Sequence, residues 1–125
     1  MRNVLTEGRK KVIFAQAPFM QWVRIFNSEI EAHQRIQSNK PQLVIVDGKR
    51  LCIVRLADKF YVVQDSCTHS GASLSGGHIN YLGEIICPLH NYCFNLQTGT
   101  ELSSRSSDLT TYPVKIDETG FFIGV

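Results

Sequence analysis

The sequence contains no long hydrophobic run, no strong excess of one charge and no internal repeat. Its longest apolar stretch is far shorter than the ~20 residues that a membrane helix needs. Its formal charge of +2 is too small to favour nucleic-acid binding, and it has no cluster of lysine and arginine interleaved with aromatics. We therefore expect one globular domain that has neither a membrane nor a nucleic acid as its partner.

The N-terminal segment has only the outline of an export signal. Basic residues 9–11 precede an apolar core of four residues, Val12 to Ala15, whereas a signal peptide needs about 7–15. The sequence therefore favours a flexible extension over residues 1–19, with Met20 as a candidate true start, and a folded domain over residues 20–125. A cytoplasmic location is expected, and in that reducing compartment cysteines more often bind metal than pair with each other.

Short β-strands separated by turns dominate the rest of the sequence. Strands are expected at residues 22–26, 43–46, 51–56, 60–63, 81–86, 114–116 and 121–123, and another begins at Phe94. The Asp47-Gly48 pair predicts a left-handed hairpin turn. Ser28 and Glu31 form a capping box, which predicts a short helix that ends near Ser38. The fold class is therefore all-β with one short helix.

Two short clusters carry the chemistry, Cys67-Thr68-His69 and Cys87-Pro88-Leu89-His90. They lie in two expected loops, residues 65–80 and 86–95, and 17 residues separate His69 from Cys87. Two thiolates and two imidazoles suit an iron–sulfur cluster that is bound asymmetrically, with both cysteines on one iron and both histidines on the other. Asn91 tolerates a left-handed backbone, so the second loop can turn there without glycine.

Other interpretations of these side chains have less support. A zinc site usually places its cysteines two to four residues apart and its histidines three to five apart, whereas each pair here is mixed. A Cys67–Cys87 disulfide is weaker still. Cys52 alternates with inward-facing strand residues and is expected to be a buried thiol. Cys93 is expected to be a core thiol. His33 is expected to be a solvated residue of the helix, and His78 is not expected to bind metal.

At these residues the chain resembles the small Rieske-type [2Fe-2S] ferredoxins. The pattern C-x-H-x17-C-x2-H is complete, and the similarity continues through residues 90–99 and 112–116. The resemblance implies an antiparallel β base, a sandwich or barrel, that carries a small cluster-binding subdomain. It also implies one [2Fe-2S] cluster per chain, held by Cys67, His69, Cys87 and His90, with the two histidines near the surface.

Departures from the family pattern imply a low reduction potential. Ala72 and Leu89 replace the cysteines that form a disulfide in high-potential relatives, and Tyr92 and Phe94 replace a serine and a tyrosine that donate hydrogen bonds. We therefore expect a potential near the low end of the Rieske range, roughly −150 to −50 mV. The loop over residues 103–111 lacks the proline that in the family commonly stiffens the segment covering the cluster. This absence puts in doubt how well the cluster is shielded.

The resemblance implies an electron carrier rather than an enzyme. Family members transfer electrons from an NAD(P)H-dependent flavoprotein reductase to a terminal oxygenase. Two alternatives stay open: a small subunit of NAD(P)H nitrite reductase or a redox-responsive subunit, and a zinc-stabilised interaction module. Leu74 and Leu89 are expected to form a small apolar contact patch around the histidines.

Overall fold

A computed structural model describes residues 4–5, 12–13 and 20–125 of the chain. Strand β1 (Val4–Leu5) pairs antiparallel with β2 (Val12–Ile13). The rest of the extension that we expected over residues 1–19 lies outside the described residues. In the described part, each sheet is built from antiparallel strand pairs.

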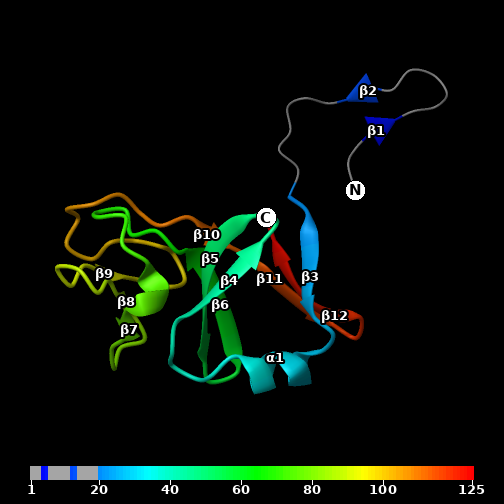
Figure 1. Cartoon of the computed structure of the whole chain (residues 1–125), viewed down its shortest axis with the longest axis horizontal. Coiled ribbons are helices and arrows are strands. Elements are labelled where there is room, and N and C mark those ends of the chain that lie inside the picture. Colours follow the sequence, from blue (N-terminus) through cyan, green and yellow to red (C-terminus); the bar gives the residue numbers. More distant parts are fainter. Residues whose placement is uncertain (1–3, 6–11, 14–19) are drawn as a thin grey trace.

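The central sheet has the strand order β10–β6–β5–β4. Its strands are β4 (Gln42–Val46), β5 (Lys49–Leu56), β6 (Lys59–Gln64) and β10 (Thr111–Tyr112). Asp47 and Gly48 join β4 to β5 with φ angles of 53° and 79°, which confirms the predicted left-handed turn. Figure 1 shows this sheet in the middle of the molecule, between the two other layers.

A second sheet completes the base, with the strand order β11–β12–β3. Its strands are β3 (Trp22–Phe26), β11 (Val114–Asp117) and β12 (Gly120–Gly124). Phe121 and Ile123 of β12 are fully buried between this sheet and the central one. The two sheets therefore form a sandwich, and within the described residues they do not close into a barrel.

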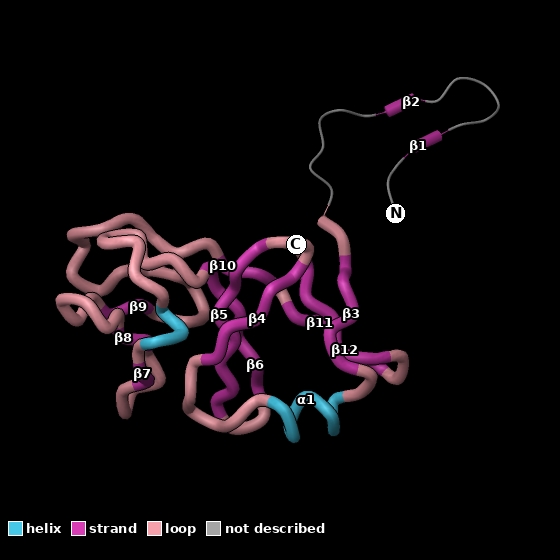
Figure 2. Tube along the Cα trace, viewed as in Figure 1, coloured by secondary structure: helices cyan, strands magenta, loops and turns pink. Residues whose placement is uncertain are grey.

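The third sheet belongs to a smaller lobe that contains both Cys/His clusters (Figure 2). It is formed by β7 (His78–Ile79), β8 (Ile85–Ile86) and β9 (Cys93–Phe94), and a single 3₁₀ turn, η1 (Leu74–Gly76), precedes it. The expected strand over residues 81–86 is therefore wrong in its first half, because residues 81–84 turn back on themselves. The Asn80 carboxamide closes this turn by accepting from the N–H groups of Leu82 and Glu84, each at 2.9 Å.

Strand β5 is buried on both faces, and this property joins the two lobes. Leu51 and Ile53 face the base core, whereas Cys52 and Val54 alternate with them and face the cluster lobe. All four are at most 1% exposed. The cluster lobe therefore packs directly on a strand that the base holds from its other side.

Helix α1 (Glu29–Arg35) begins as predicted but ends earlier. Ser28 accepts from the Glu31 N–H at 3.0 Å, and the Glu31 carboxylate accepts from the N–H of Asn27 rather than that of Ser28. Ile36 is extended and only 5% exposed, so its burial in the base core ends the helix before Ser38. Neither this helix nor any other in the described part of the chain has the length and apolar character to span a membrane.

Candidate metal centre

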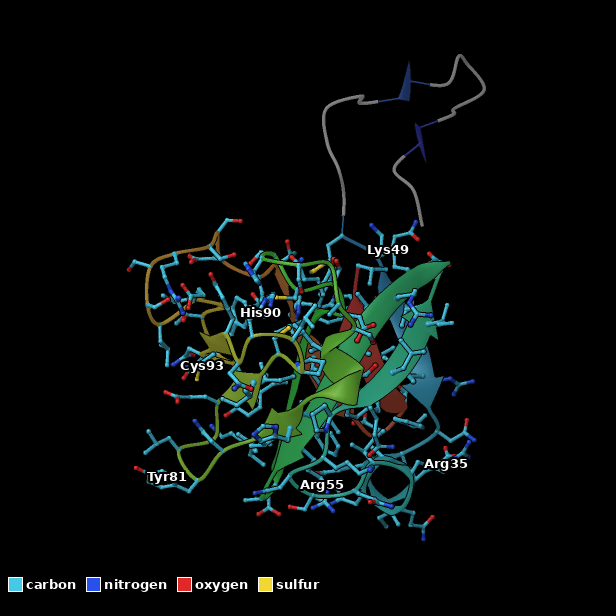
Figure 3. The ribbon with its side chains drawn as sticks, turned by 60° about the vertical axis from the view of Figure 1, so that its left-hand side comes forward. Arg35, Lys49, Arg55, Tyr81, His90 and Cys93 are labelled. Carbon is cyan, nitrogen blue, oxygen red and sulfur yellow. The ribbon has the colours of Figure 1, made fainter. Side chains whose placement is uncertain are left out.

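The structure brings the two Cys/His clusters together at one end of the small lobe. Cys67 and His69 lie between β6 and η1, and Cys87 and His90 lie between β8 and β9. Both cysteines are buried, with exposed fractions of 2% and 0%, whereas both histidines are exposed. Figure 3 shows where His90 lies in this lobe.

The four side chains form two like pairs. The imidazole rings of His69 and His90 lie edge to face, with their centroids 5.2 Å apart. Burial raises the pKa of the Cys87 thiol; the Leu89 N–H opposes this shift, and interaction with the Cys67 thiol adds to it. The structure therefore has an inner pair of thiols and an outer pair of imidazoles.

This arrangement fits a [2Fe-2S] cluster. Thiolates are the soft ligands of such clusters, and a Rieske centre has two cysteines on one iron and two histidines on the other. Among the described residues, no group of three or more His, Cys, Asp and Glu side chains gathers in a way that could hold a single metal ion. A cluster in which each of two irons has two protein ligands needs no such group.

The two ligand loops have the same backbone plan. The N–H of Cys67 donates to the carbonyl of Ala72 at 2.9 Å, and that of Cys87 donates to the carbonyl of Tyr92, also five residues on, at 2.8 Å. Two residues after each cysteine, a backbone N–H donates to its sulfur at 3.4 Å, from His69 to Cys67 and from Leu89 to Cys87. Hydrogen-bond donors near the two cysteine sulfurs are therefore supplied by the loops themselves.

Left-handed backbone allows both loops to turn. Gly71 has a φ of 78°, and Asn91 has a φ of 56°, which confirms the prediction for Asn91. His90 is itself left-handed, with a φ of 67°. Sequence reasoning missed this feature, although histidine, like asparagine, is enriched several-fold in that region.

Two side chains, Tyr92 and then Arg105, stack in turn over His69. The Tyr92 ring lies parallel to the His69 imidazole, with a centroid separation of 3.8 Å and an interplanar angle of 9°. The guanidinium carbon of Arg105 lies 4.4 Å from the Tyr92 ring centroid. In the sequence, Tyr92 stood out only as the residue in the place of a serine, and no pattern pointed to Arg105.

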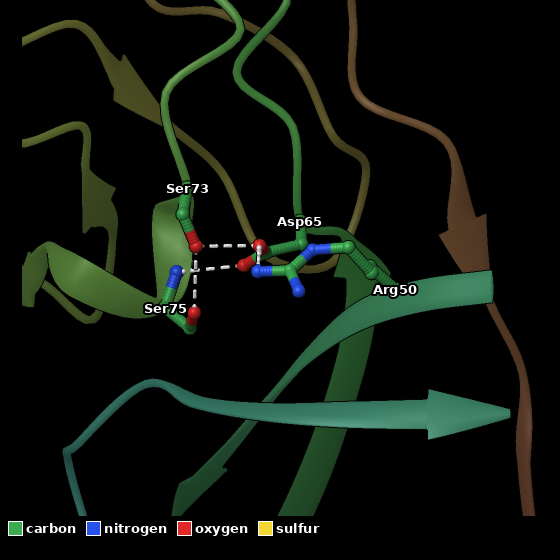
Figure 4. Close-up of polar contacts among 4 residues, drawn as sticks. All are labelled: Arg50, Asp65, Ser73 and Ser75. Carbon is green, nitrogen blue, oxygen red and sulfur yellow. Dashed lines mark hydrogen bonds and ion pairs between the residues drawn. The ribbon is translucent and has the colours of Figure 1, made fainter. Parts of the chain in front are cut away.

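A hydrogen-bonded network under the site fixes the first ligand loop to the base (Figure 4). Asp65 is 2% exposed and lies two residues before Cys67. Its carboxylate accepts from the Ser73 hydroxyl and from the Ser75 N–H, and it lies 3.5 Å from the Arg50 guanidinium. The start and the end of this loop are thereby held at one point on β5.

The remaining cysteines, Cys52 and Cys93, are not members of the two Cys/His clusters. Cys52 is fully buried as predicted, and burial raises the pKa of its thiol to about 12. Cys93 is only half-buried, so the core position expected for it is wrong. Its thiol donates to Glu84 at 3.3 Å, and burial, followed by this hydrogen bond, raises its pKa to about 11.

The structure also shows where the remaining histidines and the two leucines of the expected apolar patch lie. His33 is not fully solvated, because its ring packs edge to face on Phe60 at 5.1 Å. His78 is exposed on β7. Leu89 is 45% exposed beside His90, but Leu74 is fully buried in the lobe core, so its predicted place in a contact patch is wrong.

Comparisons with known proteins agree with this geometry. Residues 26–113 match the family model of the Rieske [2Fe-2S] domain. The 3-phenylpropionate/cinnamic acid dioxygenase ferredoxin subunit of Shigella boydii is 36% identical over 74 residues, which are 58% of this chain and 70% of that protein. The corresponding Escherichia coli K12 subunit has the same identity and coverage.

Solved structures give the same result. The ferredoxin of carbazole 1,9a-dioxygenase from Nocardioides aromaticivorans superposes with a TM-score of 0.69 at 28% identity, over 82% of this chain and 96% of that one. A protein described as a putative NADH-dependent nitrite reductase small subunit from Mycobacterium tuberculosis shares the fold, with a TM-score of 0.71 at 19% identity over 86% of this chain and 96% of that one. With two-thirds of its length inside the family model, the chain belongs to the Rieske [2Fe-2S] domain family and is a Rieske-type ferredoxin.

Proposed function

We propose that Cys67, His69, Cys87 and His90 hold the [2Fe-2S] cluster of this ferredoxin, within a Rieske domain that spans residues 20–125. The observation that carries the assignment is the sorting of the four side chains into a buried thiol pair and an exposed imidazole pair, whose rings lie 5.2 Å apart. When bound, the cluster supplies one-electron redox chemistry.

The residues around the site determine from which side an electron can enter or leave it. The buried cysteines and the lobe core behind them keep water from the inner side of the site. The exposed His69 and His90 rings present the outer side, where a partner can approach closely. The N–H groups that donate to the cysteine sulfurs stabilise added negative charge there.

We propose that the chain receives electrons from an NAD(P)H-dependent flavoprotein reductase and passes them to a terminal oxygenase. Relatives described as dioxygenase ferredoxin subunits support this role. So does a solved complex of oxygenase and ferredoxin in carbazole 1,9a-dioxygenase, whose ferredoxin is 30% identical to this chain. A cytoplasmic location is part of the proposal, since none of the four described cysteines is paired in a disulfide.

The ligand assignment is tested on protein purified without oxygen. We expect a reddish-brown protein with two irons and two sulfides per chain, which dithionite bleaches to give a Rieske-type EPR signal. His90→Ala and Cys87→Ala should abolish the signal. Matched controls are His78→Ala and Cys93→Ala, which remove a histidine and a cysteine of the same lobe without touching the proposed ligands.

Two results would contradict the assignment. A colourless protein that holds one zinc would favour the interaction module, and a normal EPR signal from His90→Ala would exclude that ligand. The partner is tested by reconstitution: reduced protein should support turnover of a dioxygenase component. Activity restored only to a nitrite reductase large subunit would favour the alternative role.

A further inference from the structure

The stack on His69 places a positive charge behind a proposed iron ligand. Tyr92 covers one face of the imidazole at 3.8 Å, and Arg105 covers the far side of the same Tyr92 ring at 4.4 Å. Tyr92 is half-buried and Arg105 is exposed, so the three groups form a column from the site to the surface. We propose that Arg105 is a positioning residue that acts on His69 through Tyr92 and raises the reduction potential of the cluster.

The Arg105 side chain is held in place by its own loop. The Glu101 carboxylate accepts from the backbone N–H of Arg105 at 2.6 Å, and the side-chain Nε of Arg105 donates to the Ser103 hydroxyl at 2.7 Å. The same carboxylate accepts from the Ser103 hydroxyl. This chain of contacts orients the guanidinium plane, and an oriented cation acts more strongly on a fixed site than a freely rotating one does.

The loop does not need the Arg105 side chain in order to stay closed. Thr68 donates to the Ser107 carbonyl at 2.6 Å and lies 2.6 Å from the Ser106 hydroxyl. With Glu101, these contacts fix the loop on both sides of Arg105. The guanidinium is therefore not required to close the loop, and it lies over the Tyr92 ring.

The expected direction follows from charge. Reduction adds one negative charge to the site, and a fixed positive charge nearby favours the reduced form. Because Arg105 is exposed, solvent and salt weaken this effect. Tyr92 contributes by restraining the His69 ring and by excluding water from the space between the cation and the imidazole.

The inference rests on the proposed ligand role of His69, and its test keeps the two claims apart. Arg105→Gln removes the charge, Arg105→Lys keeps it, and Arg35→Gln makes the same change on α1, on the opposite side of the view from His90 (Figure 3). The measurements are the midpoint potential by protein-film voltammetry, the iron content and the EPR signal of each cluster-loaded protein.

We expect Arg105→Gln to retain iron and the EPR signal but to lower the one-electron reduction equilibrium constant about threefold, which is about 28 mV at about 59 mV per tenfold. Arg105→Lys should recover most of the shift, and the shift should shrink at high salt. In a Tyr92→Ala background, Arg105→Gln should have at most half of its effect.

Three outcomes would overturn the role of Arg105. Equal shifts from Arg105→Gln and Arg35→Gln would show that only net charge matters. A full shift in the Tyr92→Ala background would remove Tyr92 as the intermediate, and equal potentials for Arg105→Lys and Arg105→Gln would exclude the charge. A wild-type protein without a cluster would instead overturn the ligand assignment.

Discussion

The Thr68 hydroxyl donates to the carbonyl oxygen of Ser107 at 2.6 Å, across a wide separation in the sequence. Thr68 lies between two proposed ligands, Cys67 and His69, so this bond ties the covering loop directly to the site. The loop over residues 103–111 contains no proline, and these side-chain hydrogen bonds hold it beside the site.

Replacing Thr68 with valine should loosen the covering loop without changing the shape of the side chain. The variant loses the bond to Ser107 and the contact with Ser106, each worth about 1 kcal/mol. We expect the cluster to be lost severalfold faster in the presence of a chelator, measured as the decay of visible absorbance. Thr111→Val, on the exposed face of β10, is the control and should keep the wild-type rate.

Glu101 is the buried anchor of the same loop, with 2% of its surface exposed. Burial raises the pKa of its carboxyl, but hydrogen bonds from Ser103, Arg105 and Ser106 outweigh burial and hold the pKa below its ordinary value of 4.5. The stabilisation from the ionised form is therefore complete above the ordinary pKa and is lost as the pH falls through the lowered one.

Glu101→Gln should accordingly lower the Tm by a few degrees at neutral pH. The difference from wild type should stay constant down to about pH 5.5 and shrink below the ordinary pKa of the carboxyl. Thermal unfolding between pH 3.5 and 7.5 measures this, with the exposed Glu118→Gln as the control. A difference that grows as the pH falls would contradict the assigned role.

Local patterns predicted the base well because each depends on neighbours in sequence. Strand β3 covers residues 22–26 as the alternation indicated, and the Asp47-Gly48 turn has the expected left-handed angles. The wrong predictions fall where burial in the tertiary structure, rather than the local sequence, determines where an element ends or whether a side chain is exposed. Ile36 leaves the helix to enter the base core, and Leu74 enters the lobe core although glycines and serines surround it.

The proposed ligands were accessible to sequence reasoning because iron chemistry restricts the residue types and their spacing. The side chains that surround these residues could not be predicted from the sequence. Tyr92 meets His69, and Arg105 meets Tyr92, only because two loops fold against each other. The parallel backbone plan of the two loops was equally hidden, since a hydrogen bond from a cysteine N–H to a carbonyl five residues on depends on backbone geometry and not on residue type.

Gly77 provides a steric test of how the second ligand loop is positioned. A Cβ atom at Gly77 would lie 2.0 Å from the carbonyl oxygen of Ile86, the residue before Cys87. Gly77→Ala should therefore push β7 away from β8, cost about 1–3 kcal/mol of stability and lower the iron content of the purified protein. Gly76→Ala is a closely matched control, because a Cβ there meets nothing within 4 Å.

Ser70 provides a hydroxyl near a ligand sulfur, which the comparison with high-potential relatives did not anticipate. Its oxygen lies 3.8 Å from Cys87 Sγ and accepts from the Ala72 N–H at 3.2 Å. When Cys87 is a thiolate, the proton of this contact belongs to the hydroxyl, and the bond favours the more negative, reduced site.

Ser70→Ala should therefore lower the midpoint potential by on the order of tens of millivolts, where about 59 mV corresponds to a tenfold change in the one-electron equilibrium. Iron content and the EPR signal should be retained, because the four proposed ligands are untouched. Ser66→Ala is the control: it removes an exposed hydroxyl just before Cys67. An unchanged potential in Ser70→Ala would mean that the backbone N–H groups of His69 and Leu89 supply the hydrogen bonding that matters at the sulfurs.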